Sequence, residues 1–281
     1  MKKIILCCLL LMPFCTGLGC GKKFGSDSTL TNSNPNPNYP LAGWTLVWND
    51  EFDGPSIDPT KWGYETGGSG WGNNELEYYT DRKENSFIEN GSLVIQALKE
   101  NYSGKSYTSA RMVTKYRGDW LYGRFEIRAK LPYGVGTWPA IWMLPTDWAY
   151  GGWPASGEVD IMEHVGYDPN VIHGSTHCQK YYFKIGTQKT ATIKETNVFS
   201  EFHTYGVEWF PEKIDFFVDS VKYFSSTNDS TGWEAWPFDK RFHLLLNIAI
   251  GGDWGGAKGV DNSIFPQRMY IDYVRVYKKA Q

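Results

Sequence analysis

Three carboxylic acids lie within six residues of the segment SGEVDIMEHVG, which spans residues 156–166. Glu158 and Asp160 are two residues apart, and Glu163 follows three residues later. The residues between them are apolar and partly β-branched, which favours a strand. Side chains alternate between the two faces of a strand, so a regular strand would place Glu163 on the face opposite to Glu158 and Asp160.

A β-bulge at Ile161 and Met162 would bring the three acids onto one face, because the two residues of a bulge occupy the space of one. Glu158 and Glu163 would then have α-carbons about 13 Å apart, at a rise of about 3.3 Å per residue. If each side chain leaned inward by about 4 Å, the carboxyl groups would lie about 5 Å apart, which is the separation found in retaining glycosidases. The spacing therefore predicts a bulge in this strand.

Two carboxyl groups at that separation can cleave a glycosidic bond. One attacks the anomeric carbon while the other protonates the leaving oxygen, and water then hydrolyses the covalent intermediate. Repulsion among three neighbouring acids raises at least one pKa and keeps a proton available near neutral pH. Clustered acids can also form a solvated strand face or a Ca²⁺ site, so the triplet alone leaves these interpretations open.

Strands must position these acids. In many segments of the chain apolar residues alternate with polar ones, as they do in strands. The alternation is clear in GRFEIRAKL (residues 123–131), KIDFFVDSVKYF (213–224) and RFHLLLNIAIGG (241–252). No segment beyond the N-terminal region has a convincing long helical period, so we expect an all-β protein with two packed antiparallel sheets. A curved sheet would form a groove, and Asn247 would then be either part of its floor or an ordinary hydrogen-bonded strand residue.

Composition favours one large domain without a nucleic-acid partner. The chain has 281 residues, and β-sandwiches often exceed 200 residues as a single unit. It carries 28 basic and 31 acidic residues with no block of like charge, which gives no electrostatic signal for nucleic acid. Aromatic residues make up 16%, including 13 tryptophans, which suits a sandwich core or a groove in which sugars stack.

The first 20 residues have the pattern of a bacterial lipoprotein signal peptide. Lys2 and Lys3 precede an apolar run that is too short to span a membrane permanently. Small residues follow and end at Cys20, as in a lipobox whose cysteine is lipidated, although Gly17 stands where leucine is usual. We therefore expect an exported protein, lipid-anchored through Cys20 to the outer membrane or cell surface, with a secreted or periplasmic protein as the alternative.

Residues 21–40 are polar and rich in Ser, Asn and Pro, which predicts a flexible linker before a folded domain over residues 41–281. Four of the five cysteines lie in the signal region, so Cys178 has no partner for a disulfide within the domain. A domain of this size can be stabilised by its apolar core instead.

The segment GEVDIMEHVG resembles the active-site signature of glycoside hydrolase family 16 in its bulged form. Other segments resemble the endo-β-1,3-glucanase and mixed-linkage glucanase branch of that family, from Trp44 to Tyr277, among them LVWNDEFDG, GWGNNELEYYTDRKENSF, YTSARMVTKYRGDW, GVGTWPAIWMLP, NIAIGGDWGG and DYVRVY. The resemblance implies a β-jelly-roll sandwich of two curved antiparallel sheets, with a substrate cleft across the concave face. It also implies that Glu158 is the nucleophile, Glu163 the general acid/base and Asp160 an assisting carboxylate.

The resemblance further implies a set of substrate-binding residues. Trp138, Trp142 and Trp153 resemble tryptophans of the cleft, where an indole stacks on a sugar ring; core packing is the alternative for each. Asn73 and Arg111 resemble residues that hydrogen-bond sugar hydroxyls on the non-reducing side of the scissile bond, and the alternative for the arginine is a salt bridge beneath the cleft.

Two more residues are implied near the acids. His177 resembles a histidine that family members carry near the acid/base, with a structural histidine as the alternative. Trp254, in the glycine-rich segment GGDWGG, would line the cleft.

No cofactor is expected for catalysis, but many relatives hold one structural Ca²⁺ on the convex side. By resemblance its ligands would be Glu51, the carbonyl of Gly91 and Asp272, which would join the two ends of the domain.

The expected activity is endo-acting, retaining hydrolysis of β-1,3-glucan, mixed-linkage β-1,3/1,4-glucan or both, by a monomer. An agarase-like or carrageenase-like hydrolase of the same family is the nearest alternative. A surface glycan-binding lipoprotein without turnover would lack a catalytic glutamate, whereas both glutamates are present here.

Overall fold

The structure, a computed structural model, describes residues 41–280. The predicted signal peptide over residues 1–20, with Cys20, and the predicted linker over residues 21–40 lie outside the described residues. The described residues form β-strands and one short 3₁₀ helix, η1 (Phe183–Ile185). No helix among them has the length and apolar character needed to cross a membrane.

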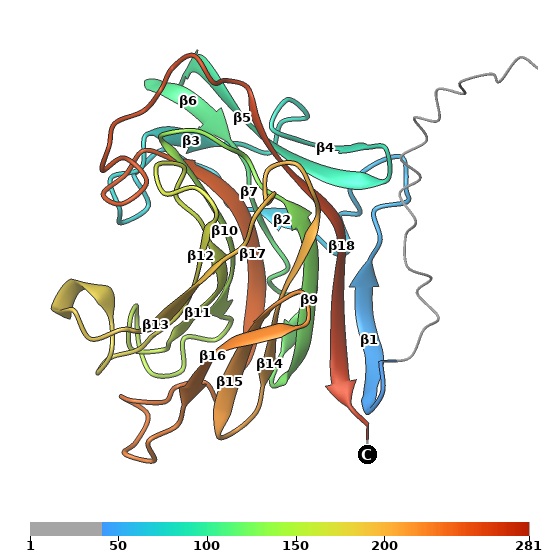
Figure 1. The fold of residues 1–281 in the computed structure, drawn as a ribbon, viewed down its shortest axis with the longest axis vertical. Helices are drawn as coiled ribbons and strands as arrows, with labels where there is room; N and C mark the ends of the chain where they lie inside the picture. Colours follow the sequence, from blue (N-terminus) through green and yellow to red (C-terminus); the bar gives the residue numbers. More distant parts are fainter. Residues whose placement is uncertain (1–40, 281) are drawn as a thin grey trace, which may run out of the picture. The chain divides into compact units, whose positions relative to one another are not determined.

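The larger sheet has ten strands, and their arrangement can be followed in Figure 1. Its main order is β16 (Val221–Thr227), β15 (Lys213–Val218), β14 (His203–Trp209), β9 (Gly123–Lys130), β18 (Gln267–Lys279), β5 (Ser92–Tyr102), β6 (Lys105–Ser109) and β3 (Glu77–Tyr79). Two further strands pair at its side, β1 (Trp44–Asp50) with β18 and β4 (Ser86–Glu89) with β5. All of these pairs are antiparallel except β3 and β6, which run parallel.

Eight strands form the second sheet, in which every pair is antiparallel. The order is β13 (Lys189–Lys194), β12 (Val171–His177), β11 (Glu158–Glu163), β10 (Thr137–Pro145), β17 (Phe242–Ile250), β7 (Arg111–Val113) and β2 (Gly63–Tyr64), with β8 (Asp119–Trp120) also paired to β17. The acidic strand β11 therefore lies inside the sheet, with two strands on one side of it and five, β8 included, on the other.

The two sheets pack face to face through the residues that the sequence alternation predicts. Phe125 and Ile127 of β9 and Leu244 and Leu246 of β17 are fully buried in one apolar cluster. Contacts between β17 and β5 and between β11 and β14 join the sheets. Burial of this apolar surface is the main favourable term for folding, and the predicted two-sheet, all-β architecture is confirmed.

Strand β11 contains the predicted bulge. Asp160 pairs with Ser175 and Glu163 pairs with His173 on β12, so three residue intervals on β11 lie opposite two on β12. The pairing of β11 with β10 shifts at the same place. Both residues of the range Ile161–Met162 are buried in the core between the sheets. The extra residue reverses the alternation there, so that all three acids share the face away from the core.

The two ends of the described domain lie side by side, because β1 pairs with β18 (Figure 1). A buried ion pair joins the same two segments. Arg275 donates from Nε to Glu51 Oε1 at 2.9 Å and from Nη2 to Glu51 Oε2 at 2.7 Å. Two parallel hydrogen bonds of this kind fix the geometry of both side chains.

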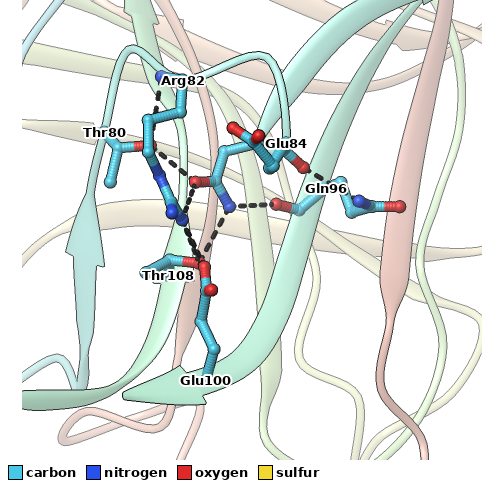
Figure 2. A network of polar contacts seen from close by, with 7 residues as sticks. Thr80, Arg82, Glu84, Gln96, Glu100 and Thr108 are labelled. Carbon is cyan, nitrogen blue, oxygen red and sulfur yellow. Dashed lines mark hydrogen bonds and ion pairs between the residues drawn. The ribbon is translucent and has the colours of Figure 1, made fainter. Parts of the chain in front are cut away.

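A buried polar network fixes the segment between β3 and β4 (Figure 2). Asn85 is fully buried, and its amide nitrogen donates to the Gln96 carbonyl and to Thr108 Oγ1, each at 3.0 Å. Its Oδ1 accepts hydrogen bonds from Thr80 Oγ1 at 2.6 Å and from Arg82 Nη2 at 3.0 Å. This network joins the connection after β3 to β5 and β6.

The Asn85→Ala variant should lower the free energy of unfolding by about 2–4 kcal/mol, because it leaves several buried donors and acceptors without partners. Denaturant unfolding measures this change. Lys83→Ala is the matched control, since Lys83 lies in the same connection and is exposed. Equal stability of the two variants would contradict the role assigned to the network.

Candidate active site

A cavity of about 740 Å³ lies on the face of the eight-stranded sheet that carries the three acids. Alternation separates this face from the core: Ile141 and Met143 of β10 are in the core cluster, whereas Trp142 and Leu144 line the cavity. The lining includes every residue predicted to cleave or bind substrate: Glu158, Asp160, Glu163, Asn73, Arg111, Trp138, Trp142, Trp153, His177, Asn247 and Trp254. The predicted cleft is therefore present, and the sequence predictions for its lining converge on one place.

Two tryptophans hold the outer acids of the triplet. Trp153 donates from its indole Nε1 to Glu158 Oε2 at 3.0 Å. Trp138 donates in the same way to Glu163 Oε1 at 3.0 Å. Each bond fixes one carboxyl rotamer, and each leaves the second carboxyl oxygen without an indole donor.

The middle acid faces a histidine from the neighbouring strand. His177 lies opposite Glu158 in the β11–β12 pairing. Its Nε2 is 3.1 Å from Asp160 Oδ2 and 3.9 Å from Glu158 Oε1. Both Asp160 and His177 are more than nine-tenths buried. The imidazole is the only basic side chain within ion-pair distance of the triplet in the described part of the chain.

Burial is the largest cause of the altered acidity of all three groups, and it raises the pKa of Glu158, Asp160 and Glu163 to about 8 each. The charge of Asp160 raises the pKa of both glutamates further, while His177 opposes it. The indole bonds to Glu158 and Glu163 also lower their pKa values. The site therefore retains protons at neutral pH, as a general acid requires.

Arg111 of β7 lies between two indole rings. Its guanidinium carbon is 4.6 Å from the ring centre of Trp71 and 4.6 Å from that of Trp142. Nε also donates to Glu65 Oε2 at 2.7 Å. Stacking and the ion pair together hold the planar group rigidly at the cleft wall. The arginine thus lines the cleft and also forms the salt bridge that the sequence left as the alternative.

A chain of hydrogen bonds connects the cleft floor to the wall beside β3. Trp142 donates from Nε1 to Asn247 Oδ1 at 2.8 Å, and Asn247 Nδ2 donates to Tyr79 Oη at 3.0 Å. Tyr79 donates in turn to Glu75 Oε2 at 2.9 Å, and Asn73 Nδ2 donates to Glu75 Oε1 at 3.3 Å. Both hydrogen-bonding groups of the Asn247 side chain are engaged, so it holds Trp142 in place from within the floor.

The segment that carries Asn73 is attached to the end of β17. The Asp253 amide donates to the Asn73 carbonyl at 2.7 Å, and Ile250 N donates to Glu77 Oε2 at 2.6 Å. Gly252 has φ +74°, and a Cβ there would meet the Asn73 carbonyl oxygen at 2.9 Å. The glycine permits this close approach and so sets the path of the loop that carries Trp254.

Trp254 extends the aromatic wall on the Glu163 side. Its ring centre is 5.4 Å from that of Trp138 and 4.9 Å from that of His173, in edge-to-face geometry in both cases. His173 pairs with Glu163 across the strands. This wall therefore continues the predicted cleft past the acid triplet.

Some lining residues were not predicted from the sequence: Trp71, Glu75, Trp148, His173, Phe183, Lys184 and Asp253. His173 could have been found, because it lies four residues before His177 on one strand and therefore shares its face. Trp71 stands two residues from the predicted Asn73. Phe183 and Lys184 carry no comparable signal, because they lie in the single-turn 3₁₀ helix η1 after β12.

The predicted calcium ligands lie in places that do not favour the ion. The Glu51 carboxylate is bound by Arg275, and Asp272 Oδ2 accepts from Arg128 Nη1 at 2.6 Å. Gly91 lies in the turn between β4 and β5. Ca²⁺ binding through these two carboxylates would have to displace both arginines, so the side chains as placed do not fit the ion. The calcium site stays a prediction.

Cys178 follows β12 and is buried, and its Sγ donates to the Ala235 carbonyl at 3.3 Å. It is a free thiol within the described residues. Burial raises the pKa of this thiol, which makes it less nucleophilic. A structural role accounts for it.

Comparisons with known proteins agree with this fold and site. The model of the family described as "Glycosyl hydrolases family 16" matches residues 72–275. A "Beta-glucanase" of Rhodothermus marinus is 52% identical over 244 residues, covering 84% of this chain and 85% of that protein. A "Glucan endo-1,3-beta-glucosidase A1" of Niallia circulans is 37% identical over 264 residues, covering 85% of this chain and 38% of that protein.

A solved structure is also similar over most of its length. The X-ray structure of the laminarinase from Rhodothermus marinus matches with a TM-score of 0.83 and 51% identity, covering 85% of this chain and 98% of that chain. The predicted jelly-roll fold is therefore confirmed. The family match, these identities and the bulged acidic strand lead to one conclusion: the chain belongs to glycosyl hydrolases family 16.

Proposed function

We propose that the protein is an endo-acting β-glucanase that hydrolyses β-1,3-glucan, mixed-linkage β-1,3/1,4-glucan or both. The observation that carries this proposal is the bulge in β11, which places three buried acids with raised pKa values in an aromatic cleft. The relatives described above support glucan as the substrate, since their names specify β-glucanase, endo-1,3-β-glucosidase and laminarinase.

The cleft geometry supports endo action. Lining residues occur on β7, β17 and β10 on one side of the acids and on β12 and β13 on the other. A polysaccharide can therefore extend past the scissile bond in both directions. Arg111 and Asn73 would bind sugar hydroxyls on the non-reducing side, and Trp138, Trp153 and Trp254 offer ring faces or edges to the sugars.

In the proposed mechanism, the Glu158 carboxylate attacks the anomeric carbon while Glu163 donates its proton to the glycosidic oxygen, and the bond to the leaving sugar breaks. Glu163 then takes a proton from water, the water oxygen bonds to the anomeric carbon, and Glu158 is released. Within residues 41–280, His177 is the only basic side chain within ion-pair distance of Glu158 and Asp160, which favours ionisation on that side. Two inversions in sequence give net retention of configuration.

We also propose that the protein is exported, anchored through lipidated Cys20 and monomeric. Export and anchoring are supported by the basic, apolar and small-residue pattern of residues 1–20 and by the polar composition of residues 21–40.

The Glu158→Gln variant should lower kcat on laminarin by more than about 1000-fold, because it removes the nucleophile while keeping the size and hydrogen-bonding reach of the side chain. Reducing-sugar release from laminarin and from barley mixed-linkage glucan measures turnover, and NMR of the first products gives their anomeric form. Glu212→Gln, at an exposed position, is the control. Full activity of Glu158→Gln, or inverted products, would contradict the mechanism.

Activity should fall as the pH rises through about 8, because Glu163 then loses the proton that it donates. The Trp138→Phe variant removes an indole bond that lowers the pKa of Glu163, so the alkaline limb of kcat/KM should move to higher pH. Trp148→Phe changes another cleft tryptophan that makes no bond to the acids and should leave the limb in place. An unchanged limb in Trp138→Phe would refute this assignment of the acid.

The Cys20→Ser variant tests the anchor. Wild-type protein expressed in a bacterial host with lipoprotein processing should sediment with membranes, whereas Cys20→Ser should stay in the soluble exported fraction, because one thiol carries the lipid. Fractionation with immunoblotting measures the distribution, and Cys178→Ser is the matched control. Soluble wild-type protein would exclude the anchor.

A further inference from the structure

Three metal-ligating side chains converge on the cleft floor. One ligand atom each from Glu158, Asp160 and His177 lies within 4.8 Å of the other two. His177 Nε2 is 3.1 Å from Asp160 Oδ2 and 3.9 Å from Glu158 Oε1. Two carboxylates and one imidazole are a common donor set for transition-metal ions in proteins.

A second observation points to a ligand at the same place. Asp160 is 3% exposed, and its Oδ2 accepts no hydrogen bond within residues 41–280. This oxygen faces His177 Nε2, so it points into the cluster. A buried carboxylate oxygen that accepts no hydrogen bond is unfavourable even with an imidazole nitrogen 3.1 Å away, and a cation bound by both atoms would stabilise it.

We propose that Glu158, Asp160 and His177 bind a divalent ion of the Zn²⁺ class at the catalytic centre and that the bound ion inhibits turnover. Binding is a property of these three side chains, whereas inhibition rests on the function proposed above. Glu158 cannot be a metal ligand and a nucleophile at the same time, so metal binding and glycosidic cleavage exclude each other.

The distances favour Zn²⁺ over the common hard cations. Tetrahedral ligands at about 2.0–2.1 Å from zinc lie about 3.3 Å from each other. The separations of the two carboxylate oxygens from His177 Nε2, 3.1 Å and 3.9 Å, lie on either side of this value, so shifts of less than about 1 Å would bring each carboxylate to the required distance from the imidazole. Ca²⁺ requires about six to eight oxygen ligands and Mg²⁺ an octahedral oxygen shell, which this nitrogen-containing set does not supply.

A second cluster in the described residues provides an internal comparison. Glu195, His203 and Asp219 also bring three ligand atoms within 4.8 Å. Asp219 already uses both oxygens, however: Oδ2 is 2.9 Å from His203 Nδ1, and Oδ1 accepts from the Thr204 amide at 2.8 Å. Its side chain is also 47% exposed. Both carboxylate oxygens of Asp219 therefore already have partners, and the cluster carries no proposal.

Isothermal titration of zinc chloride into the purified protein tests the proposal, with magnesium chloride as the control ion. Wild type should bind one Zn²⁺ and no Mg²⁺, and EDTA should reverse the binding. Removing a residue that only orients a metal ligand weakens metal binding by about 10–100-fold. His177 is itself a proposed ligand, so His177→Gln should weaken Zn²⁺ binding by about 100-fold or more. His203→Gln should bind Zn²⁺ as wild type does and keep wild-type glucanase activity in EDTA.

Asp160→Asn is the second variant, and it should also weaken Zn²⁺ binding. Far-UV circular dichroism checks that each variant is folded. Absence of Zn²⁺ binding by wild type, unchanged binding by both His177→Gln and Asp160→Asn, or loss of binding in His203→Gln would overturn the proposal. Laminarin hydrolysis measured in EDTA separates the two proposals. Zn²⁺ binding without any turnover would refute the proposed function alone, and turnover that persists in Zn²⁺-saturated enzyme would refute inhibition.

Discussion

Burial of three carboxyl groups on one strand is the constraint around which the cleft is organised. Ionised carboxylates are unstable away from water unless they are paired, and no lysine or arginine forms an ion pair with these acids in the described residues. Their pKa values rise instead, and protons remain in the site. The groups around them, two indoles and one imidazole, stabilise partial ionisation without neutralising the cluster.

The remaining polar groups of the cleft are fixed by neighbours that keep them rigid. Arg111 is held between two indoles and by Glu65, and Asn247 links Trp142 to Tyr79. Side chains held in this way lose little further conformational entropy when a sugar chain binds. The polar network around Asn85 fixes the connection that follows β3 in the same way, by tying it to β5 and β6.

Much of this arrangement could be predicted from the sequence because it follows from alternation. Ile161 and Met162 are adjacent and apolar, and both could enter the core only if the strand bulged, which in turn placed Glu163 beside Asp160. Phe183 and Lys184 could not be placed, since the single turn of η1 is too short to show a period in the sequence. The double role of Arg111 was also hidden, because its partners Glu65 and Trp71 are distant in the sequence. They reach it through the pairing of β2 with β7 and the link between Asn73 and Asp253.

The pairing of β1 with β18 has a consequence for how such a domain is assembled into larger proteins. Both ends of the described chain belong to the ten-stranded sheet, whereas the cleft opens on the other face of the eight-stranded one. A module joined at either end therefore enters at the layer away from the polysaccharide and does not block it. The Niallia circulans relative, of which this chain covers 38%, shows that the domain is compatible with long additional sequence. Both attachment points thus lie in the sheet that does not carry the cleft.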